Sequence, residues 1–422
     1  MFANMNLTKK LVLLFLAFGL VPMSVVGWIA YNATSSIEGK ITQRFEDVAV
    51  GIADKIDRNL SERYGDVQAF ALNRAIFNRD QWFQIGERRS DIVAAMNQYV
   101  ETNNIYFLTI LVDLEGNVIA VNSKNAEGRA INTEAIYLKN YRNTPWFQAV
   151  SSGNFSTRMP YSAPGNDVLD GTFIEDLHID EDVKASYSND DGLTVGFSAP
   201  VYQDGKVIAY WSNRSRFSPV EDIFKAAYAE LKNNGFPGSE LTLLDKDGRV
   251  IVDYDPIRAG SEEIVHDFGV LMELNLAEKG VRAAQEVVGG KRGNGWAFHA
   301  RKEIVQAAGY THLRGALGYP GMNWSVLARV PQSEAGAEIN AIRRNIYLSV
   351  GLCLGLILAL GIFVGRNFAA PLIKMADAAK KIAVGDINQK IEHRSGDEIG
   401  SLAQAFRTLI EYIKGIAEGA EG

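Results

Sequence analysis

Two apolar segments without a charged residue constrain this chain more than any other feature. Residues 11–31 read LVLLFLAFGLVPMSVVGWIAY, and residues 345–365 read NIYLSVGLCLGLILALGIFVG. About 20 helical residues span the ~30 Å hydrocarbon core of a bilayer, and neither segment has the polar face of a helix on a soluble core. We therefore predict two transmembrane helices, with the rest of the chain folding on either side of a membrane.

The flanking charges predict the orientation of these helices. Lys9 and Lys10 precede the first segment, and basic residues follow the second, namely Arg366, Lys374, Lys380 and Lys381. Because basic residues are retained in the cytoplasm, both ends are predicted to be cytoplasmic and residues 32–344 external. A cleaved signal peptide is the alternative for residues 11–31, but the segment is longer than a usual h-region and no A-x-A-like site follows.

Composition excludes several classes of function. The only cysteine among the 422 residues is Cys353, inside the second apolar segment, so the external part has no disulfide or cysteine metal site. A net charge of −7 without a basic, aromatic-rich run argues against nucleic-acid binding. No nucleophile, zinc or phosphate-loop motif is present, and the five histidines are scattered. We expect no catalysis, cofactor or metal within this chain.

A long helix is predicted directly after the first apolar segment. From residue 37 to residue 67, apolar residues recur at steps of three and four, which is the period of an amphipathic helix. The positions are Ile37, Ile41, Phe45, Val48, Ile52, Ile56, Leu60, Tyr64 and Val67. A single helix of this length would serve as stalk and spine for the external part.

Two later stretches share one plan. Residues 105–123, IYFLTILVDLEGNVIAVNS, and residues 239–256, SELTLLDKDGRVIVDYDP, each read as two strands around a tight turn. Their cores align with the aspartate, the glycine and the following valine in register, about 132 residues apart. This predicts an internal duplication and two similar tandem domains, with a chance likeness of common hairpins as the alternative.

Further strand-like runs follow each hairpin. They are LTVGFSAPVY and KVIAYWSNRS in the first copy, and WAFHARKEI and WSVLARVP in the second. Meandering strands after helices predict α+β domains with antiparallel sheets. A helix near residues 331–344 should enter the second apolar segment without a linker. Residues 167–191 carry nine carboxylates and His178; their spacing fits no EF-hand, so we expect a solvated loop rather than a calcium site.

The segment after residue 365 predicts two short amphipathic helices. The first follows Pro371, Gly385 and Asp386 interrupt it, and the second begins near Glu398. Two such helices cannot bury their apolar faces alone, but two chains together form a parallel four-helix bundle. The motifs FAAPL, VGD and DEIGSLAQAF resemble a HAMP domain over about residues 366–418. The resemblance implies signal-transmission roles for Pro371, Gly385, Asp397, Glu398 and Gly400.

The external part resembles the double-Cache sensor module, in which two PAS-like Cache domains stand on a long N-terminal helix. The motifs are LVDLEGNVIAV, PWF, FSAPVY and GYPGMNWSVLARVP. The order of parts is similar to that of a bacterial methyl-accepting chemotaxis receptor whose signalling domain is missing from this chain. The expected boundaries are 1–10 cytoplasmic, 11–31 and 345–365 transmembrane, 35–335 double-Cache (distal Cache about 75–235, proximal Cache about 236–332), 366–418 HAMP and 419–422 the start of the output region.

The resemblance places a ligand in the distal Cache. Amino-acid-binding members carry a tyrosine, an arginine five residues later, Trp-Tyr two residues after that, and an aspartate after the PVY strand. Tyr137 and Arg142 keep the first spacing, and Trp146-Phe147 stands for Trp-Tyr. Thr144, however, holds the place two residues before the tryptophan. Other predicted ligand-binding residues are Tyr161, Trp211, Asn213 and Arg214.

The departures from this pattern change the expected ligand. Asn213 and Arg214 stand where the aspartate is expected, and Arg214 would repel an ammonium group. If Arg142 and Arg214 both face the site, a carboxylate is the expected ligand group, because arginine binds carboxylates bidentately. In the alternative interpretation Trp146 and Phe147 pack the sheet on the helix, and Arg142 pairs with a structural carboxylate.

The sequence therefore predicts a homodimeric receptor in the bacterial inner membrane with a periplasmic sensor domain. Its partners would be a small-molecule ligand and, for a chemoreceptor, a cytoplasmic kinase and adaptor. The sensor half of a membrane histidine kinase or diguanylate cyclase is the alternative, because both share this front half. A third hypothesis is that the external module binds a periplasmic binding protein instead of a free ligand.

Overall fold

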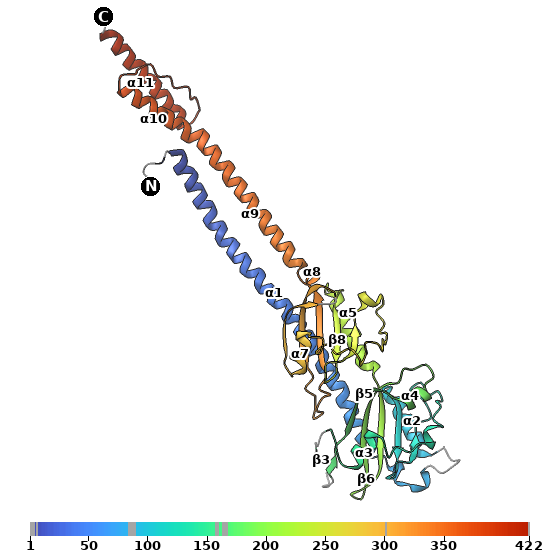
Figure 1. The fold of residues 1–422 in the computed structure, drawn as a ribbon. Coiled ribbons are helices and arrows are strands. Elements are labelled where there is room, and N and C mark those ends of the chain that lie inside the picture. Colours follow the sequence, from blue (N-terminus) through green and yellow to red (C-terminus); the bar gives the residue numbers. More distant parts are fainter. Residues whose placement is uncertain are drawn as a thin grey trace. The chain divides into compact units, whose positions relative to one another are not determined.

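The computed structural model describes residues 5, 7–82, 90–156, 160–162, 168–299 and 302–420. The chain divides into two compact units. One unit, Gly39–Gly336, contains two antiparallel five-stranded sheets; the other, Met1–Glu38 with Ala337–Gly422, is helical in its described part (Figure 1). The prediction of an α+β protein with two sheets and a long N-terminal helix is confirmed.

Helix α1, Leu7–Phe70, runs for 64 residues without interruption. In the sheet unit, the predicted apolar stripe is buried, including Phe45, Ile52, Ile56 and Leu60. These residues belong to one hydrophobic core that also contains side chains from both sheets. The helix is therefore the common wall on which both sheets lie.

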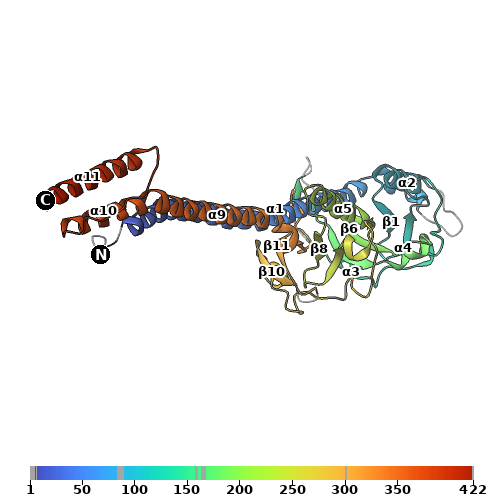
Figure 2. The ribbon, with the colours of Figure 1, turned by 90° about the horizontal axis from the view of Figure 1, so that it is seen from above.

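The first sheet has the order β2-β1-β7-β6-β5 and is antiparallel throughout. Its strands β1 and β6 are labelled in Figure 2. The predicted hairpin over 105–123 is confirmed, because β1 and β2 pair around a turn at Asp113–Asn117. The elements of this domain are η2 Arg74–Phe77, η3 Arg79–Gln81, α2 Asp91–Asn103, β1 Tyr106–Val112, β2 Val118–Val121, η4 Ile136–Leu138, α3 Pro145–Ser151, β3 Pro160–Ser162, β4 Val168–Asp170, β5 Phe173–Ile179, α4 Glu181–Ser186, β6 Leu193–Gln203 and β7 Lys206–Arg216.

The second sheet repeats this topology as β9-β8-β12-β11-β10. The repeat extends to the register: β1 pairs Leu111 with Ala120, and β8 pairs Leu243 with Val252, each just before a bulge. WAFHARKEI, predicted as one strand, instead ends β10 and begins β11. The elements are α5 Ser218–Asn233, β8 Glu240–Leu244, β9 Val250–Tyr254, α6 Pro256–Ala259, α7 Arg282–Val288, β10 Gly293–His299, β11 Ile304–His312, β12 Ser325–Pro331 and α8 Gln332–Ala335.

Each sheet has one face on α1 and one face turned away from it. On the α1 side Gly309 of β11 lies so close to the helix that a Cβ there would stand 2.0 Å from the backbone nitrogen of Glu46. On the opposite side the first sheet packs with α3 and η4, and the second sheet packs with α7. Two separate polar clusters lie on these opposite faces.

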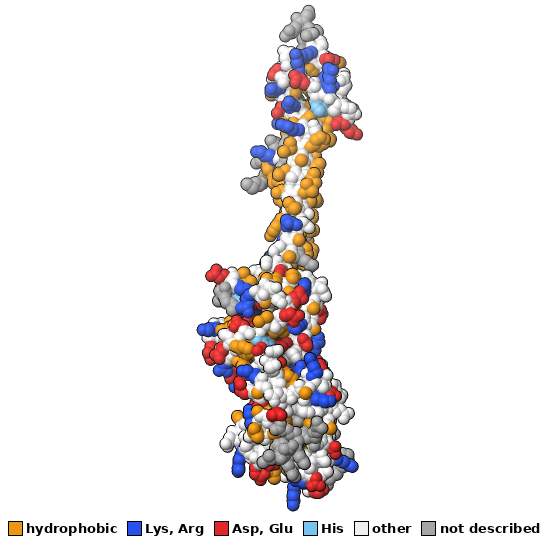
Figure 3. Space-filling model, turned by 90° about the vertical axis from the view of Figure 1, so that its right-hand side faces the viewer, with side chains coloured by type: hydrophobic (Ala, Val, Ile, Leu, Met, Phe, Trp, Pro, Cys, Tyr) orange, Lys and Arg blue, Asp and Glu red, His pale blue; other side chains and the backbone are white. Residues whose placement is uncertain are grey.

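The helical unit contains the two apolar segments. Two helices are long and apolar enough to cross a membrane, and exposed hydrophobic side chains line them (Figure 3). Gly19 of α1 permits close packing, since a Cβ there would lie 2.3 Å from the Ile357 side chain. As predicted, the helix enters the second apolar segment without a linker from Ala337 onward, as α9; only its first turn, α8, is separate, because Gly336 interrupts it. The remaining elements are α9 Ala337–Val364, the π-helical turn Gly365–Ala369, α10 Ala370–Ala383 and α11 Glu398–Ala420.

Candidate functional site

A buried arginine organises the face of the first sheet that points away from α1. Arg214 of β7 is 2% exposed and lies beside Gly196 of β6, which in turn lies beside Glu175 of β5. The three residues form a row across the sheet, and a Cβ on Gly196 would stand only 3.1 Å from Glu175 Oε2. The absent side chain of Gly196 thus leaves room for the two charged groups. We call Glu175, Asp180, Asp182, Arg214, Tyr141 and Trp146 the Arg214 cluster.

Asp180 is the closest partner of this arginine. Its Oδ2 accepts a hydrogen bond from Arg214 Nε at 2.7 Å, and its Oδ1 caps α4 by accepting the N–H groups of Asp182 and Val183. Burial raises the pKa of Asp180, but the Arg214 guanidinium, His178 and the Val183 N–H together outweigh burial and bring the pKa below its usual range. Asp180 therefore stays ionised, and its hydrogen bond holds Arg214 in place.

Aromatic side chains close one side of the cluster. Arg214 lies over the Trp146 ring, with 5.5 Å between the guanidinium carbon and the ring centroid. The ring centroids of Tyr141 and Trp146 lie 5.6 Å apart, and the Tyr141 hydroxyl donates to Asp182 Oδ2 at 2.6 Å. Lys139 also contacts Asp182, from a half-exposed position. Acidic and basic side chains therefore both lie beside the rings of Tyr141 and Trp146.

Two polar atoms in this cluster have no hydrogen-bond partner in the described part of the chain. They are Glu175 Oε2 and Trp146 Nε1, one acceptor and one donor, and both are buried. The nearest cation to Glu175 Oε2 is His178, whose Nε2 lies 3.8 Å away. Buried polar groups are nearly always paired, so an orphaned donor and acceptor in one cluster favour a bound polar molecule at this place.

The structure places the first group of predicted residues at different depths. Trp146 and Phe147 are buried in α3, and Tyr137 is buried with its hydroxyl near the Val121 backbone. Thr144 donates its hydroxyl to the carbonyl of Tyr141 at 2.7 Å. Arg142 is exposed beside the β1–β2 turn, where Gly116 packs on its backbone. The exposed Arg142 therefore does not share the buried environment of Arg214.

Two other predicted residues lie on the wrong face of the sheet. Trp211 packs on Phe70 of α1, and its Nε1 donates to Asn213 at 2.8 Å on the same face. Successive side chains of a strand point to opposite faces, so β7 sends Trp211 and Asn213 toward α1 and Arg214 away from it. The prediction that these residues share one site is wrong. Tyr161 lies in β3, but its side chain is outside the described part of the structure.

The acidic members of the cluster were missed by the sequence interpretation. Residues 167–191 were expected to be a solvated loop, but they contain β4, β5 and α4, and Asp180 and Asp182 are buried. A usable signal was present, because Asp180 begins a helix as an N-cap residue directly after the strand-like run FIEDLHI. No group of three His, Cys, Asp or Glu side chains among the described residues could hold a metal ion.

Two polar contacts join the two sheet domains. Trp324, immediately before β12, donates its Nε1 to Asp176 Oδ1 of β5 at 3.0 Å. His266 of the second domain stands between Asp191 Oδ2 at 2.8 Å and Glu221 Oε1 of α5 at 2.7 Å. Asp176 is the neighbour of Glu175, so β5 contacts the Arg214 cluster with one residue and the second domain with the next.

The predicted signal-transmission residues lie at the ends of α10 and α11. Pro371 is buried in the first turn of α10, and Gly385 has the left-handed φ of +97° just after this helix. Asp397 Oδ1 accepts the N–H of Gly400 at 2.9 Å, and a Cβ on Gly400 would overlap the Ser395 carbonyl at 1.8 Å. Glu398 is exposed at the start of α11. The DEIG sequence thus makes a tight helix entry that only glycine permits.

A comparison with known protein families matches part of the helical unit. Residues 363–415 match the HAMP domain family. Transducer protein Htr18 of Halobacterium salinarum is 34% identical over 110 residues, which are 26% of this chain and 14% of that protein. Transducer protein BasT of the same organism is 25% identical over 249 residues, 59% of this chain and 28% of that protein. The chain thus spans less than a third of either relative.

A comparison with solved structures finds chemoreceptor ligand-binding domains among the similar chains. The ligand-binding domain of the Pseudomonas fluorescens chemoreceptor CtaA, in complex with L-isoleucine, aligns with a TM-score of 0.45 and 14% identity. The alignment covers 73% of this chain and 99% of that domain. The chain carries a HAMP domain and is a relative of transducer proteins.

Proposed function

We propose that this HAMP-containing relative of transducer proteins is the sensor and transmission part of a chemotaxis receptor in the bacterial inner membrane. In this proposal the two apolar helices cross the membrane, residues 39–336 lie outside the cytoplasm, and the HAMP domain lies inside. The observation that carries the proposal is the Arg214 cluster, where an orphaned acceptor and donor stand beside a buried ion pair.

The charges of the cluster suggest the class of ligand. Glu175, Asp180 and Asp182 face the permanent cations Arg214 and Lys139 and the titratable His178. When His178 is neutral the carboxylates are in excess, and a ligand ammonium group would then balance the cluster. A carboxylate, the group favoured by the sequence, would pair with the exposed Arg142, which follows Tyr141 of the cluster in the sequence. We therefore propose a small ligand that carries both an amine and a carboxylate.

The route from this cluster to the HAMP domain begins at β5. A ligand on Glu175 would bias the position of β5, and Asp176 on the same strand holds Trp324 at the start of β12. β12 continues into α8 and, after Gly336, into α9 and the HAMP helices. A ligand shifts such an equilibrium only by its differential affinity for the two states. We propose that the Asp176–Trp324 contact differs between those states.

Dimerisation would complete the HAMP domain. Val384, Leu402, Leu409 and Tyr412 are exposed apolar side chains on or next to its two helices. A second copy would cover them in a parallel four-helix bundle. A cytoplasmic kinase and adaptor are the output partners in this proposal.

Ligand binding can be tested with the full chain in nanodiscs. Thermal unfolding is measured with amino acids, with dicarboxylates and with amines, because a ligand of the native state raises Tm by mass action. We expect stabilisation by a zwitterion, and its loss in Glu175→Gln. Arg249→Gln, which changes an exposed residue of the second domain, is the matched control. Stabilisation that persists in Glu175→Gln would contradict the assignment of the cluster.

Transmission needs a separate readout. Hydrogen exchange in residues 370–420 should change when the ligand found above is added, and Trp324→Phe should reduce that change while ligand binding persists. Unchanged transmission in Trp324→Phe would overturn the route but not the binding site. An output through a histidine kinase or diguanylate cyclase is the alternative, and it is compatible with both experiments. The absence of any direct ligand would favour sensing through a periplasmic binding protein.

A further inference from the structure

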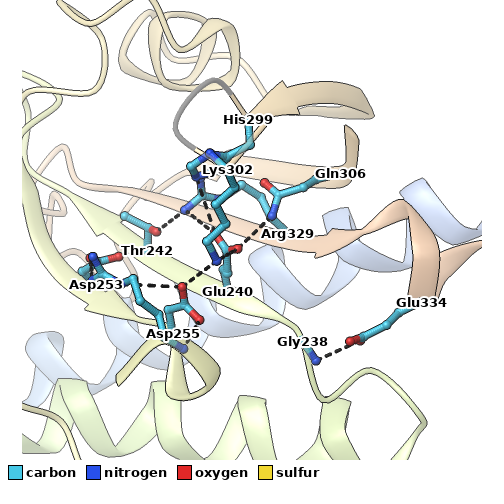
Figure 4. A network of polar contacts seen from close by, with 11 residues as sticks. Gly238, Glu240, Thr242, Asp253, Asp255, His299, Lys302, Gln306, Arg329 and Glu334 are labelled. Carbon is cyan, nitrogen blue, oxygen red and sulfur yellow. Dashed lines mark hydrogen bonds and ion pairs between the residues drawn. The ribbon is translucent and has the colours of Figure 1, made fainter. Parts of the chain in front are cut away.

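A second polar cluster lies on the face of the second sheet that points away from α1 (Figure 4). Its members are buried or half-buried and come from strands β8, β11 and β12 and from the ends of β9 and β10. We call Glu240, Asp255, Lys302, Gln306 and Arg329 the Lys302 cluster. It takes no part in the function proposed above.

The position of this cluster corresponds to that of the Arg214 cluster. In the first sheet Arg214 lies opposite Leu108 of β1, and in the second sheet Arg329 lies opposite Glu240 of β8. Leu108 and Glu240 are equivalent in the repeated hairpin, so the two arginines occupy equivalent places on equivalent faces. Arg329 is 8% exposed, and its Nε has no hydrogen-bond partner in the described part of the chain. The second sheet thus has a buried arginine and polar neighbours at the place that corresponds to the Arg214 cluster.

The ammonium group of Lys302 lies at the centre of this cluster. Lys302 Nζ donates to Asp255 Oδ2 at 2.7 Å and also contacts Glu240 Oε1, while Gln306 Nε2 donates to the same Glu240 oxygen at 2.9 Å. Burial lowers the pKa of Lys302, but the hydrogen bonds to Asp255 and Glu240 outweigh burial and raise it. Lys302 follows β10 and reaches two carboxylates on the neighbouring part of the sheet. Its charged end therefore sits where a ligand amine would bind.

We propose that the second sheet contains a binding site for a primary ammonium group and that the chain fills this site itself with Lys302. The two carboxylates, Glu240 at 3% and Asp255 at 6% exposure, are too buried to remain ionised without a cation. In the first sheet Lys139 is half-exposed and contacts Asp182, and Glu175 Oε2 has no hydrogen-bond partner among the described residues, whereas in the second sheet Lys302 pairs with both carboxylates. Removal of Lys302 opens an amine site of the same chemical class.

The test is chemical rescue in the full chain in nanodiscs. Lys302→Ala should lower Tm by about 5 °C or more, because it removes the closest cation of two buried carboxylates and leaves Glu240 with Arg329 and Asp255 with Arg258, each at 3.7 Å. n-Propylammonium chloride replaces the missing ammonium and stem, so it should recover at least about half of this loss, whereas equal sodium chloride should not. Wild-type protein and Lys232→Ala, which breaks the exposed Lys232–Glu262 pair, should show no specific response to the amine.

A double variant keeps the test decisive if Lys302→Ala folds poorly. Lys302→Ala/Glu240→Gln removes one buried carboxylate that has lost its closest cation, so it should be more stable than Lys302→Ala and should lose the amine response. The proposal is overturned if Lys302→Ala is as stable as the wild type, if propylammonium and sodium act equally, or if the double variant is no more stable than the single one. None of these outcomes bears on ligand binding at the Arg214 cluster.

Discussion

The two sheets share strand order, hairpin register and a buried arginine at equivalent positions, yet they pair that arginine differently. In the first sheet the partner of Arg214 is Asp180, which comes from the segment between β5 and α4. In the second sheet the carboxylate closest to Arg329 is Glu240, on the adjacent strand, at 3.7 Å. The repeated backbone fixes where a charged site lies, and a few substitutions decide whether the chain or a ligand occupies it.

The largest expected effect comes from breaking the pair in the first sheet. Arg214→Leu leaves Asp180 buried without the guanidinium that donates to it at 2.7 Å, so we expect a loss of about 3–5 kcal/mol in the free energy of unfolding. Chemical denaturation in detergent, followed by circular dichroism, measures it. A loss below about 1 kcal/mol would mean that water already solvates this cluster and that it is not a closed ion pair.

The second effect concerns the junction between the two domains. The hydrogen bond to Glu221, opposed by burial and supported by Asp191, raises the pKa of His266 to about 9. Because the folded pKa lies above the ordinary value of 6.5, this stabilisation is full below about pH 6.5 and is lost as the pH rises through about 9. We expect the protonated His266 to contribute up to about 3 kcal/mol to the free energy of unfolding.

The measurement is thermal unfolding from pH 6 to pH 10 for wild type and His266→Gln. The variant should lose the decline between pH 7 and pH 9, because glutamine does not titrate. Equal pH profiles for both proteins would show that the contact does not hold the two domains together.

A smaller effect is expected for the arginine of the second sheet. Arg329→Leu removes one hydrogen bond, from Nη2 to Thr242 at 2.7 Å, and an Nε that has no partner in the described part of the chain. Because Lys302 still neutralises Glu240, the loss should be about 1–2 kcal/mol. The same denaturation assay compares it with Arg214→Leu. Equal losses for the two arginines would break the contrast between the two sheets.

The smallest effect is a gain in stability. Burial raises the pKa of Asp176, so its ionised form is penalised near neutral pH. Asp176→Asn keeps an oxygen for the Trp324 N–H and removes that charge, so the variant should be more stable by about 0.5–1 kcal/mol. The gain should shrink as the pH falls, because Asp176 itself then becomes neutral. A clear loss of stability would show that the charge, and not the hydrogen bond, joins β5 to β12.

Periodicity and turn chemistry predicted most of the fold. The stripe from Ile37 to Val67 specified α1, and the Asp-x-x-Gly turns specified both hairpins, because these signals are local. The break at Gly336 and the division between β10 and β11 were missed, since a glycine and a short turn inside apolar or mixed sequence give a weak signal. Element boundaries depend on contacts that the local sequence does not contain.

The site was predicted only in part, for a physical reason. Trp146 and Arg214 meet as expected, but the strand period places Trp211 and Asn213 on the opposite face. Asp180 reaches Arg214 from 34 residues away in sequence, through the pairing of β5 with β6. A single sequence shows which residues share a strand face, but it does not show which strands are neighbours.

The π-helical turn Gly365–Ala369 has a consequence for anyone who joins this chain to a different output domain. A π-turn accommodates one residue more than an α-turn, so it sets the rotational phase of α10 relative to α9. An extra residue in an ordinary α-helix would turn every later side chain by about 100° around the axis, whereas the π-turn takes up that residue with almost no rotation. The number of residues in this turn is therefore a design parameter. Chimeras fused before and after it should differ in their resting output even when every contact outside the membrane is preserved.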